Sequence, residues 1–454
     1  MKRLIETELQ HWFKSNDRKP LIIRGARQVG KTWLIRHFAH SLNYQLVELN
    51  FEQYSQYRDL FKTNDPREIL LNIETALGIS INIQNSILFL DEIQAVPELL
   101  AKLRWFYENL PELPVIAAGS LLEFVLAEHS FSMPVGRIEY LYLEPFSFLE
   151  FLQALTKEKL KEYIENFQWS KEIPGTLHEQ LMKIFKQYIL IGGMPAAIKK
   201  WLETQSLADV QKIQMNLIAT YQDDFNRYSK KIPVEIVQAV FKAVPRMIAK
   251  KFIYSKVDEN LNSEKIKQTL NLLSLAKICH KVIHTNANGV PIGAEINEKF
   301  IKVIFLDVGL CASLLGLNLM SLDSVMNFRA VNNGAISEQI VGQMLRTIYP
   351  SYIEPKNFYW QRQTKGSEAE VDYVIQINDK VYPIEVKAGT TGTLKSLHVF
   401  MENKKLNLAF RINADVPSRT AVNIKTSQGN TVEYELFSLP FYLVSEISRL
   451  AIQS

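Results

Sequence analysis

A short run near the N-terminus has residue types and spacing that suit phosphate binding. Residues 25–32 read GARQVGKT, which is the glycine, lysine and threonine spacing of a P-loop. In such a loop the glycines let backbone N–H groups surround the phosphates, the lysine reaches the β- and γ-phosphates, and the threonine ligates magnesium. The candidate residues for binding ATP and Mg²⁺ are therefore Gly25, Ala26, Arg27, Gln28, Val29, Gly30, Lys31 and Thr32.

An acidic pair follows the next strongly apolar run. Residues 86–94 read SILFLDEIQ, which predicts a buried strand ending at Asp91, with Glu92 directly after it. Hydrolysis of a bound nucleotide needs one carboxylate near the metal and one near the attacking water. We expect Asp91 to hold the magnesium through water and Glu92 to polarise the water. The alternative, a strand with a solvated acidic end, is disfavoured by the P-loop upstream.

A second group of candidate residues lies in the C-terminal third of the chain. Asp372 and Glu385 each sit inside an apolar strand pattern, and Lys387 lies on the same face as Glu385 because strand side chains alternate. Buried carboxylates are costly unless they are paired or hold a metal. Two interpretations follow. We expect the three residues to form a catalytic phosphodiesterase site with Mg²⁺ or Mn²⁺. The alternative is a closed ionic cluster that only stabilises the fold.

Length and composition indicate a soluble protein of several domains. The chain has 454 residues, of which 47% are apolar and 22% charged, so several cores can form. The formal net charge of +4 permits contact with nucleic acid without arguing for it. Cys279 and Cys311 have no neighbouring cysteine, so neither a disulfide framework nor a zinc site is predicted, and a reducing cytoplasm fits. The longest apolar run, residues 308–320, is too short to span a bilayer, so no membrane segment is predicted.

Periodicity divides the chain into four segments. Residues 1–146 contain the strands and helices that surround the P-loop, and residues 147–231 show helical periodicity throughout. Residues 232–306 read as two helices and a hairpin, the order of a separate winged helix-turn-helix domain, for which DNA contact and protein docking are both open. Residues 331–454 read as helix, three strands, helix and strand.

The N-terminal motifs resemble those of the AAA superfamily and its STAND relatives, particularly a set of predicted bacterial and archaeal ATPases. The resemblance rests on the stretches IIRGARQVGKTWLI, LFLDEIQ, AAGSLLEFVL and VGRIEYLYLEPFSFLEFL, and it extends nearly end to end. It implies an ASCE-type parallel sheet for residues 1–146, a helical lid for residues 147–231, and a C-terminal domain of unknown function. Oligomer formation is consistent with this resemblance.

The resemblance also implies roles for residues outside the two main motifs. Ser120 ends a third strand, where it would sense the γ-phosphate or simply cap the helix expected after it. Arg137 would contact the γ-phosphate or act as a finger between subunits, or it is an exposed arginine beside a strand. Gly193 and Pro195 resemble a GxP motif that couples the lid to the nucleotide, or they are ordinary helix punctuation.

The element order after residue 331 resembles the PD-(D/E)xK, or restriction-endonuclease-like, fold. In that fold Asp372 and Glu385 resemble the two metal-ligating acids, Lys387 the residue that orients water, and Glu338 an extra acid from the first helix. The sequence therefore predicts an α/β chain with two candidate functions. One is an ATP-gated nuclease that acts on DNA, and the other is an ATP-dependent switch whose winged-helix and nuclease-like domains only bind DNA or partner proteins.

Overall fold

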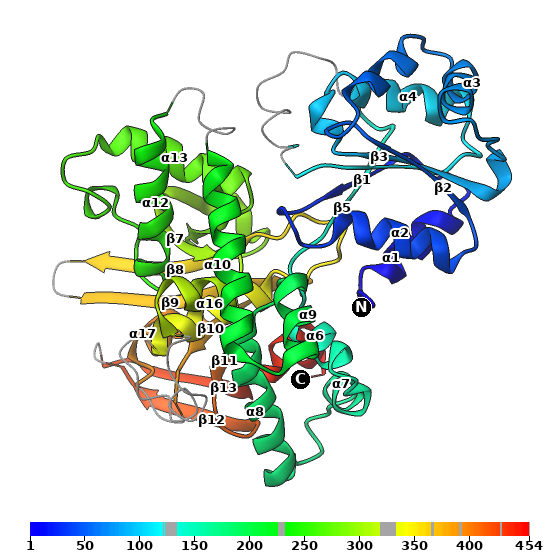
Figure 1. The fold of residues 1–454 in the computed structure, drawn as a ribbon. Helices are drawn as coiled ribbons and strands as arrows, with labels where there is room; N and C mark the ends of the chain where they lie inside the picture. The colour runs from blue at the N-terminus through cyan, green and yellow to red at the C-terminus, as the bar shows by residue number, and fades with distance from the viewer. Residues whose placement is uncertain are drawn as a thin grey trace. The chain divides into compact units, whose positions relative to one another are not determined.

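The computed structural model shown in Figure 1 divides into two compact units. Unit 1 comprises Met1–Pro145, Leu275–Lys277 and Pro350–Glu354, and unit 2 comprises the rest of the chain. The structure describes residues 1–120, 122, 134–225, 232–317, 333–364, 367–389, 393–426 and 429–453.

Unit 1 is built on a parallel sheet. Within the described residues it has five strands in the order β2-β3-β4-β1-β5. Each neighbouring pair is parallel, which confirms the predicted parallel α/β sheet. The carboxyl ends of parallel strands meet at one sheet edge, so the loops after β1 and β3 lie close together. The strands are β1 (Leu21–Arg24), β2 (Gln45–Asn50), β3 (Ser86–Asp91), β4 (Val115–Ala118) and β5 (Glu139–Tyr142).

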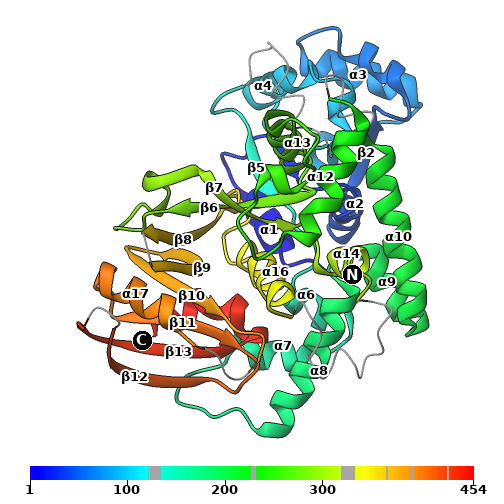
Figure 2. The same cartoon turned by 90° about the vertical axis from the view of Figure 1, so that its left-hand side faces the viewer.

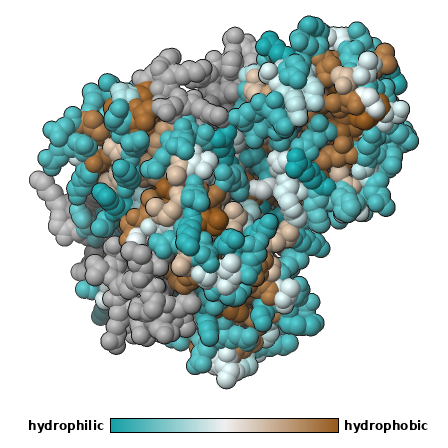
Figure 3. Space-filling view, in the orientation of Figure 1, coloured by the Kyte–Doolittle hydropathy of each residue, from teal (hydrophilic) through white to brown (hydrophobic). Residues whose placement is uncertain are grey.

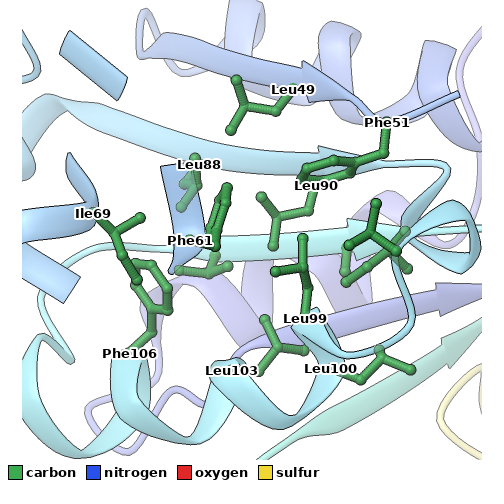
Figure 4. Packing of buried hydrophobic residues seen from close by; sticks show 14 of the residues in the cluster. Leu49, Phe51, Phe61, Ile69, Leu88, Leu90, Leu99, Leu100, Leu103 and Phe106 are labelled. Carbon is green, nitrogen blue, oxygen red and sulfur yellow. The ribbon is translucent and has the colours of Figure 1, made fainter. Parts of the chain in front are cut away.

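Helices cover this sheet and fix the positions of its strand ends. Figure 4 shows Leu88 and Leu90 of β3 facing Leu103 and Phe106 of α4 in one apolar cluster, and all four side chains are almost fully buried. Burying a side chain of this size contributes about 1.5–3 kcal/mol, so β3 is held firmly behind the acidic pair at its end. The helices are α1 (Glu6–Lys14), α2 (Lys31–Ser41), α3 (Pro66–Leu77) and α4 (Leu99–Asn109), with short 3-10 turns η1 (Ser55–Phe61), η2 (Ile83–Asn85) and η3 (Ile93–Ala95).

Unit 2 contains a larger mixed sheet. Figure 2 shows its strands edge to edge, and within the described residues there are eight, in the order β12-β13-β11-β10-β9-β8-β6-β7. The predicted order of helix, three strands, helix and strand is present as α16, β8, β9, β10, α17 and β11, and β12 and β13 extend it. The strands are β6 (Cys279–Thr285), β7 (Ile296–Phe305), β8 (Asn357–Thr364), β9 (Ser367–Ile377), β10 (Lys380–Val386), β11 (Leu408–Asn413), β12 (Ser418–Lys425) and β13 (Thr431–Pro440).

The hairpin predicted for a separate winged helix belongs to this larger sheet. The strands β6 and β7 pair antiparallel, with the second strand beginning at Ile296. However, β6 also pairs in parallel with β8, from Val282 opposite Asn357 to His284 opposite Tyr359. A strand's second edge needs hydrogen-bond partners when it is buried, and β8 supplies them. The sheet therefore runs across the expected separation between residues 232–306 and 331–454, although the domain ranges themselves stay predictions.

The segment predicted to be a helical lid is helical. Its first helix, α6, begins with a reciprocal capping box between Ser147 and Glu150. Within the described residues the segment forms α6 (Phe148–Ala154), α7 (Glu158–Glu165), α8 (Gly175–Ile191), α9 (Pro195–Thr204) and α10 (Leu207–Asp223), and its role as a lid stays a prediction. The other helices of unit 2 are α12 (Val234–Arg246), α13 (Ser263–Leu275), α14 (Val308–Leu314), α16 (Asn333–Leu345), α17 (Lys395–Lys404) and α18 (Ile447–Ile452), with 3-10 turns η4 (Tyr254–Lys256), η5 (Ile292–Glu295) and η7 (Phe441–Glu446).

The surface mixes hydrophilic and apolar residues. Figure 3 shows apolar residues interspersed with hydrophilic ones on the face that it displays. Large exposed apolar side chains of unit 1 include Trp33, Leu71 and Val135. Among the described residues, no helix is long and apolar enough to cross a membrane.

Candidate nucleotide-binding site and C-terminal charge cluster

The predicted P-loop lies between a strand and a helix, as its chemistry requires. The strand β1 ends at Arg24 and α2 begins at Lys31. The loop between them turns through positive φ angles of 152° at Gly25, 60° at Gln28 and 100° at Gly30. A Cβ atom at Gly25 would lie 2.3 Å from the carbonyl oxygen of Leu143. Glycine is therefore required there both for the backbone angle and for the close approach.

The lysine of the loop is held against the loop's own backbone. The Nζ atom of Lys31 donates to the carbonyl oxygens of Gly25 at 3.0 Å and Ala26 at 2.8 Å. The residue is only 8% exposed. The N-terminus of α2 adds positive potential at the same place. The loop thus presents a buried ammonium and a helix N-terminus together, which is an arrangement that suits phosphate groups.

Two side chains with oxygen atoms of the kind that bind Mg²⁺ lie in contact beside the loop. The hydroxyl of Thr32 donates to the carboxylate of Asp91, with oxygen–oxygen distances of 3.2 and 3.3 Å. Asn50, at the end of β2, donates from Nδ2 to Oδ2 of Asp91 at 3.2 Å. Hydroxyl and carboxylate oxygens at this separation fit Mg²⁺, which keeps several waters and takes few protein ligands. The sequence alone did not identify Asn50 as a site residue. The pairing of β2 with β3 places Asn50 opposite Asp91.

The electrostatic setting of Asp91 disfavours its charge. Burial, and then the neighbouring Glu92 and Glu48 carboxylates, raise the pKa of Asp91 to about 6. A carboxyl whose pKa is higher in the folded state stabilises the fold at low pH, and this stabilisation is lost as pH rises through that value. At neutral pH the ionised carboxylate of Asp91 therefore lowers the stability of the folded state, and a bound cation would offset this loss.

We expect Asp91→Asn to raise the stability of the nucleotide-free protein at pH 7.5 and to change it little at pH 4. The expected gain at pH 7.5 is about 1–3 kcal/mol, because the substitution removes the negative charge of a buried carboxyl group whose pKa is raised to about 6. Thermal unfolding in EDTA at the two pH values measures this. A gain of equal size at both pH values would show that the charge of Asp91 is not its cause.

The second acid is positioned by a residue that sequence reasoning missed. Glu92 adopts a left-handed backbone conformation with φ 52°, and its Oε2 accepts from Nε2 of Gln94 at 2.6 Å. A Cβ atom at Gly119 would lie 2.2 Å from Oε1 of Gln94. Gln94 therefore packs against the chain after β4 and holds Glu92 in place. Its proximity to the acidic pair in the sequence is the signal that could have identified it.

The two other residues predicted for the site in unit 1, Ser120 and Arg137, each contact a neighbouring side chain. Ser120 lies beside the P-loop, where its Oγ accepts from Nε of Arg27 at 3.1 Å. Its alternative role as a helix cap concerns residues that lie largely outside the described ones. Nε of Arg137 lies 3.1 Å from Oε1 of Glu108 on α4, and Arg104 contacts the same oxygen at 2.9 Å. Contacts of Ser120 or Arg137 with a γ-phosphate stay predictions.

The predicted GxP motif forms a buried turn between α8 and α9. Gly192 has φ 78° and ψ −174°, and the N–H of Gly193 donates to Oδ2 of Asp307 at 2.6 Å. Pro195 is the first residue of α9. Oδ1 of Asp307 also accepts from the N–H of Leu310 and so caps α14. The turn thus has a structural role, and nucleotide sensing by Gly193 and Pro195 stays a prediction.

The four C-terminal residues predicted from the sequence do come together in unit 2. The N–H of Val386 donates to Oδ2 of Asp372 at 2.8 Å, which ties β9 to the end of β10. Nζ of Lys387 lies 2.7 Å from Oε1 of Glu385. Glu338 projects from α16, and the hydroxyl of Tyr373 donates to its backbone carbonyl at 2.7 Å. The predicted convergence of two strands and one helix is therefore present.

Two further residues belong to the same group, and the sequence did not reveal them. Lys302 of β7 lies 3.1 Å from Glu338, 2.5 Å from Glu370 and 3.7 Å from Asp372, measured from Nζ to the nearest carboxylate oxygen. Glu370 precedes Asp372 by two positions on β9 and so shares its face. The C-terminal cluster consists of Lys302, Glu338, Glu370, Asp372, Glu385 and Lys387.

Proton affinities in the C-terminal cluster are strongly shifted. Burial and the charge of Asp372 raise the pKa of Glu385 to about 8 and hold that of Glu338 well above its usual range. Burial opposes the charge of Lys302, but Glu338, Asp372 and Glu370 outweigh it and hold the pKa of the lysine well above its usual range. Lys302 is therefore charged at neutral pH. Among the described residues, no three His, Cys, Asp or Glu side chains are placed to hold a metal.

Comparison with known families agrees with the N-terminal motifs. Residues 17–152 match the family model described as AAA domain. This match supports an AAA-type P-loop ATPase domain, as predicted. Two models described as domains of unknown function, DUF8612 and DUF4143, match residues 182–321 and 333–433. Neither description supports the winged-helix or nuclease-like prediction. No curated protein matches the chain.

The solved structures that match the chain include three of low sequence identity. The RuvB Holliday junction branch migration motor of Thermotoga maritima is 14% identical, covers 65% of this chain and 91% of its own, and has a TM-score of 0.29. AMPPCP-bound DnaA from Aquifex aeolicus is 14% identical over 60% of this chain and 87% of its own, with a TM-score of 0.28. The Aeropyrum pernix ORC2 protein in ADPNP–ADP complexes is 10% identical over 70% and 96%, with a TM-score of 0.26.

Proposed function

We propose that the chain is a magnesium-dependent ATPase whose nucleotide site is the P-loop of unit 1. The observation that carries the proposal is the meeting of Thr32 with Asp91 beside the buried ammonium of Lys31. ATP binding by an AAA-type domain is supported by the family match over residues 17–152. The roles of the individual residues are inferred from their positions.

Each residue of the site has a distinct task in this proposal. The loop's N–H groups and Lys31 would bind the phosphates. Thr32 and Asp91 would hold a magnesium ion, which when bound would supply positive charge beside the phosphoryl group. Glu92, oriented by Gln94, accepts a proton from the attacking water. Ser120 is linked to the loop through Arg27 and would report the presence of the γ-phosphate.

The test is a titration of a fluorescent ATP analogue into the wild-type chain and Lys31→Ala. We expect the variant to bind about 10–100-fold more weakly, because a charge-assisted hydrogen bond to phosphate contributes about 1.5–3 kcal/mol. A matched control is Lys62→Ala, since the Lys62 side chain is 78% exposed on the same unit. Equal affinities for the wild type and Lys31→Ala would remove the basis of the proposal.

Two functions compete for unit 2. Metal-dependent cleavage of DNA is favoured by the convergence of Asp372, Glu385 and Lys387. Non-catalytic docking of DNA or partner proteins is favoured by the pairing of Lys302 and Lys387 with these acids. Because the lysines already compensate the carboxylates, we propose the second: an ATP-driven switch in which the winged-helix-like and nuclease-like segments bind a partner and do not cut it.

A further inference from the structure

We infer that the ammonium of Lys302 takes the place of a divalent metal in the C-terminal cluster. The resemblance to the PD-(D/E)xK fold calls for a metal between carboxylates of adjacent strands. The residues present do not fit that requirement, because a lysine already lies among them. The inference is independent of the ATPase proposal and concerns unit 2 alone.

The position of Lys302 is built by the fold. The sheet order places β6 and β8 between β7, which carries Lys302, and β9, which carries its acidic partners. The lysine and the acidic side chains therefore meet over the strands between them, and Nζ lies 5.3 Å from the centre of the Tyr359 ring on β8. Its side chain is 4% exposed. A surface lysine that met acids by chance would be solvated, whereas this one is enclosed.

The contacts of Lys302 are those that a cation in the metal position would have. Its Nζ contacts oxygens from Glu338 on α16 and from Glu370 and Asp372 on β9. A buried cation joining three carboxyl groups from two elements compensates their charge and links helix to sheet. Removing the ammonium would leave these oxygens without a cation. A divalent ion that replaced it would have to draw the three carboxyl groups closer together, because within the described residues they are not placed to hold a metal as they stand.

Most carboxylate oxygens of Asp372 and Glu385 also have a hydrogen-bond or ion-pair partner. The second oxygen of Asp372 accepts the N–H of Val386, and one oxygen of Glu385 is paired with Lys387. Oε2 of Glu385 is buried and, within the described structure, has no hydrogen-bond partner. One such oxygen does not make a metal site. The C-terminal cluster therefore links α16, β7, β9 and β10 through charges that compensate one another.

The test is Mn²⁺ binding, followed by the electron paramagnetic resonance signal of free Mn²⁺. All samples are full-length chains that carry Asp91→Asn, so that the P-loop carboxylate does not contribute. We expect this parent to bind no Mn²⁺ that depends on Asp372. Lys302→Met should gain about one Mn²⁺ per chain, and adding Asp372→Asn should remove it. Lys299→Met, an exposed position on the same strand, is the matched control and should behave as the parent.

Two results would overturn the inference. One is a Mn²⁺ ion bound by the parent and lost in Asp372→Asn, and the other is a folded Lys302→Met chain that binds none. If circular dichroism shows that Lys302→Met does not fold, the double variant Lys302→Met with Glu370→Gln is used in its place, because it removes one carboxyl group together with the ammonium.

Incubation of the wild type with plasmid and linear DNA, with and without ATP, tests the docking proposal separately. If the wild type cleaves DNA and Asp372→Asn does not, the proposal that unit 2 only binds its partner is refuted. The role of Lys302 is decided by the Mn²⁺ titration alone.

Discussion

Glu92→Gln is expected to lower the turnover of ATP by about 10²–10⁴-fold while leaving nucleotide affinity nearly unchanged. The substitution keeps the size of the side chain and removes its ability to accept a proton. The partner Gln94 and the left-handed backbone of residue 92 are independent of that charge. Binding depends on the P-loop and Asp91, which the substitution does not touch. Release of phosphate at saturating ATP gives the turnover, and an analogue titration gives the affinity.

The matched control for this variant is Glu98→Gln. The Glu98 side chain is 56% exposed in unit 1 and lies 3.8 Å from Arg58 on the surface, where a single ion pair has little effect. Its turnover should equal that of the wild type. Turnover in Glu92→Gln that also matches the wild type would assign water activation to another group.

Gly192→Ala is expected to destabilise unit 2 by about 2–4 kcal/mol. The backbone at Gly192, with φ 78° and ψ −174°, lies in a region that side chains with a Cβ rarely adopt. The new Cβ would also lie 2.1 Å from Oδ1 of Asp307, which is buried and caps α14. Either the turn or the cap must move, and both carry buried hydrogen bonds.

Gly175→Ala provides the comparison for this prediction because it lies at the other end of the same helix. A Cβ atom at Gly175 would meet no atom within 4 Å, so its melting temperature should stay near that of the wild type. Thermal unfolding followed by circular dichroism compares the two. Equal melting temperatures for Gly192→Ala and Gly175→Ala would mean that the turn is not constrained as the structure indicates.

The arrangement of the P-loop and of the acidic pair after β3 could be predicted from the sequence because its parts are local. The residues from Gly25 to Thr32 adjoin one another, and Asp91 with Glu92 ends a strand whose apolar run is unmistakable. Strand–loop–helix context then fixes how these residues face each other. The parallel sheet brings the two motifs to one edge without any further information.

The C-terminal cluster could be predicted only in part because its decisive residue is remote. Lys302 lies in a strand expected to belong to another domain. The apolar residues beside it, Ile301 and Val303, indicate a buried strand but do not show which carboxylates the lysine meets. Its role depends on the pairing of β6 with β8, and periodicity does not reveal which strands pair across such a distance. Asp372 and Glu385 were recognisable because each interrupts an apolar strand. Glu370, at the exposed end of the same pattern, was not.

The most direct test of the central claim is the stoichiometry of ATP bound to the purified chain by calorimetry, with Mg²⁺ and with EDTA. The account predicts about one nucleotide per chain and an affinity that falls when Mg²⁺ is removed, because Thr32 and Asp91 act through the ion. The same titration with Asp91→Asn should show little effect of EDTA. Absence of saturable ATP binding, or an affinity that ignores Mg²⁺ in the wild type, would contradict the account.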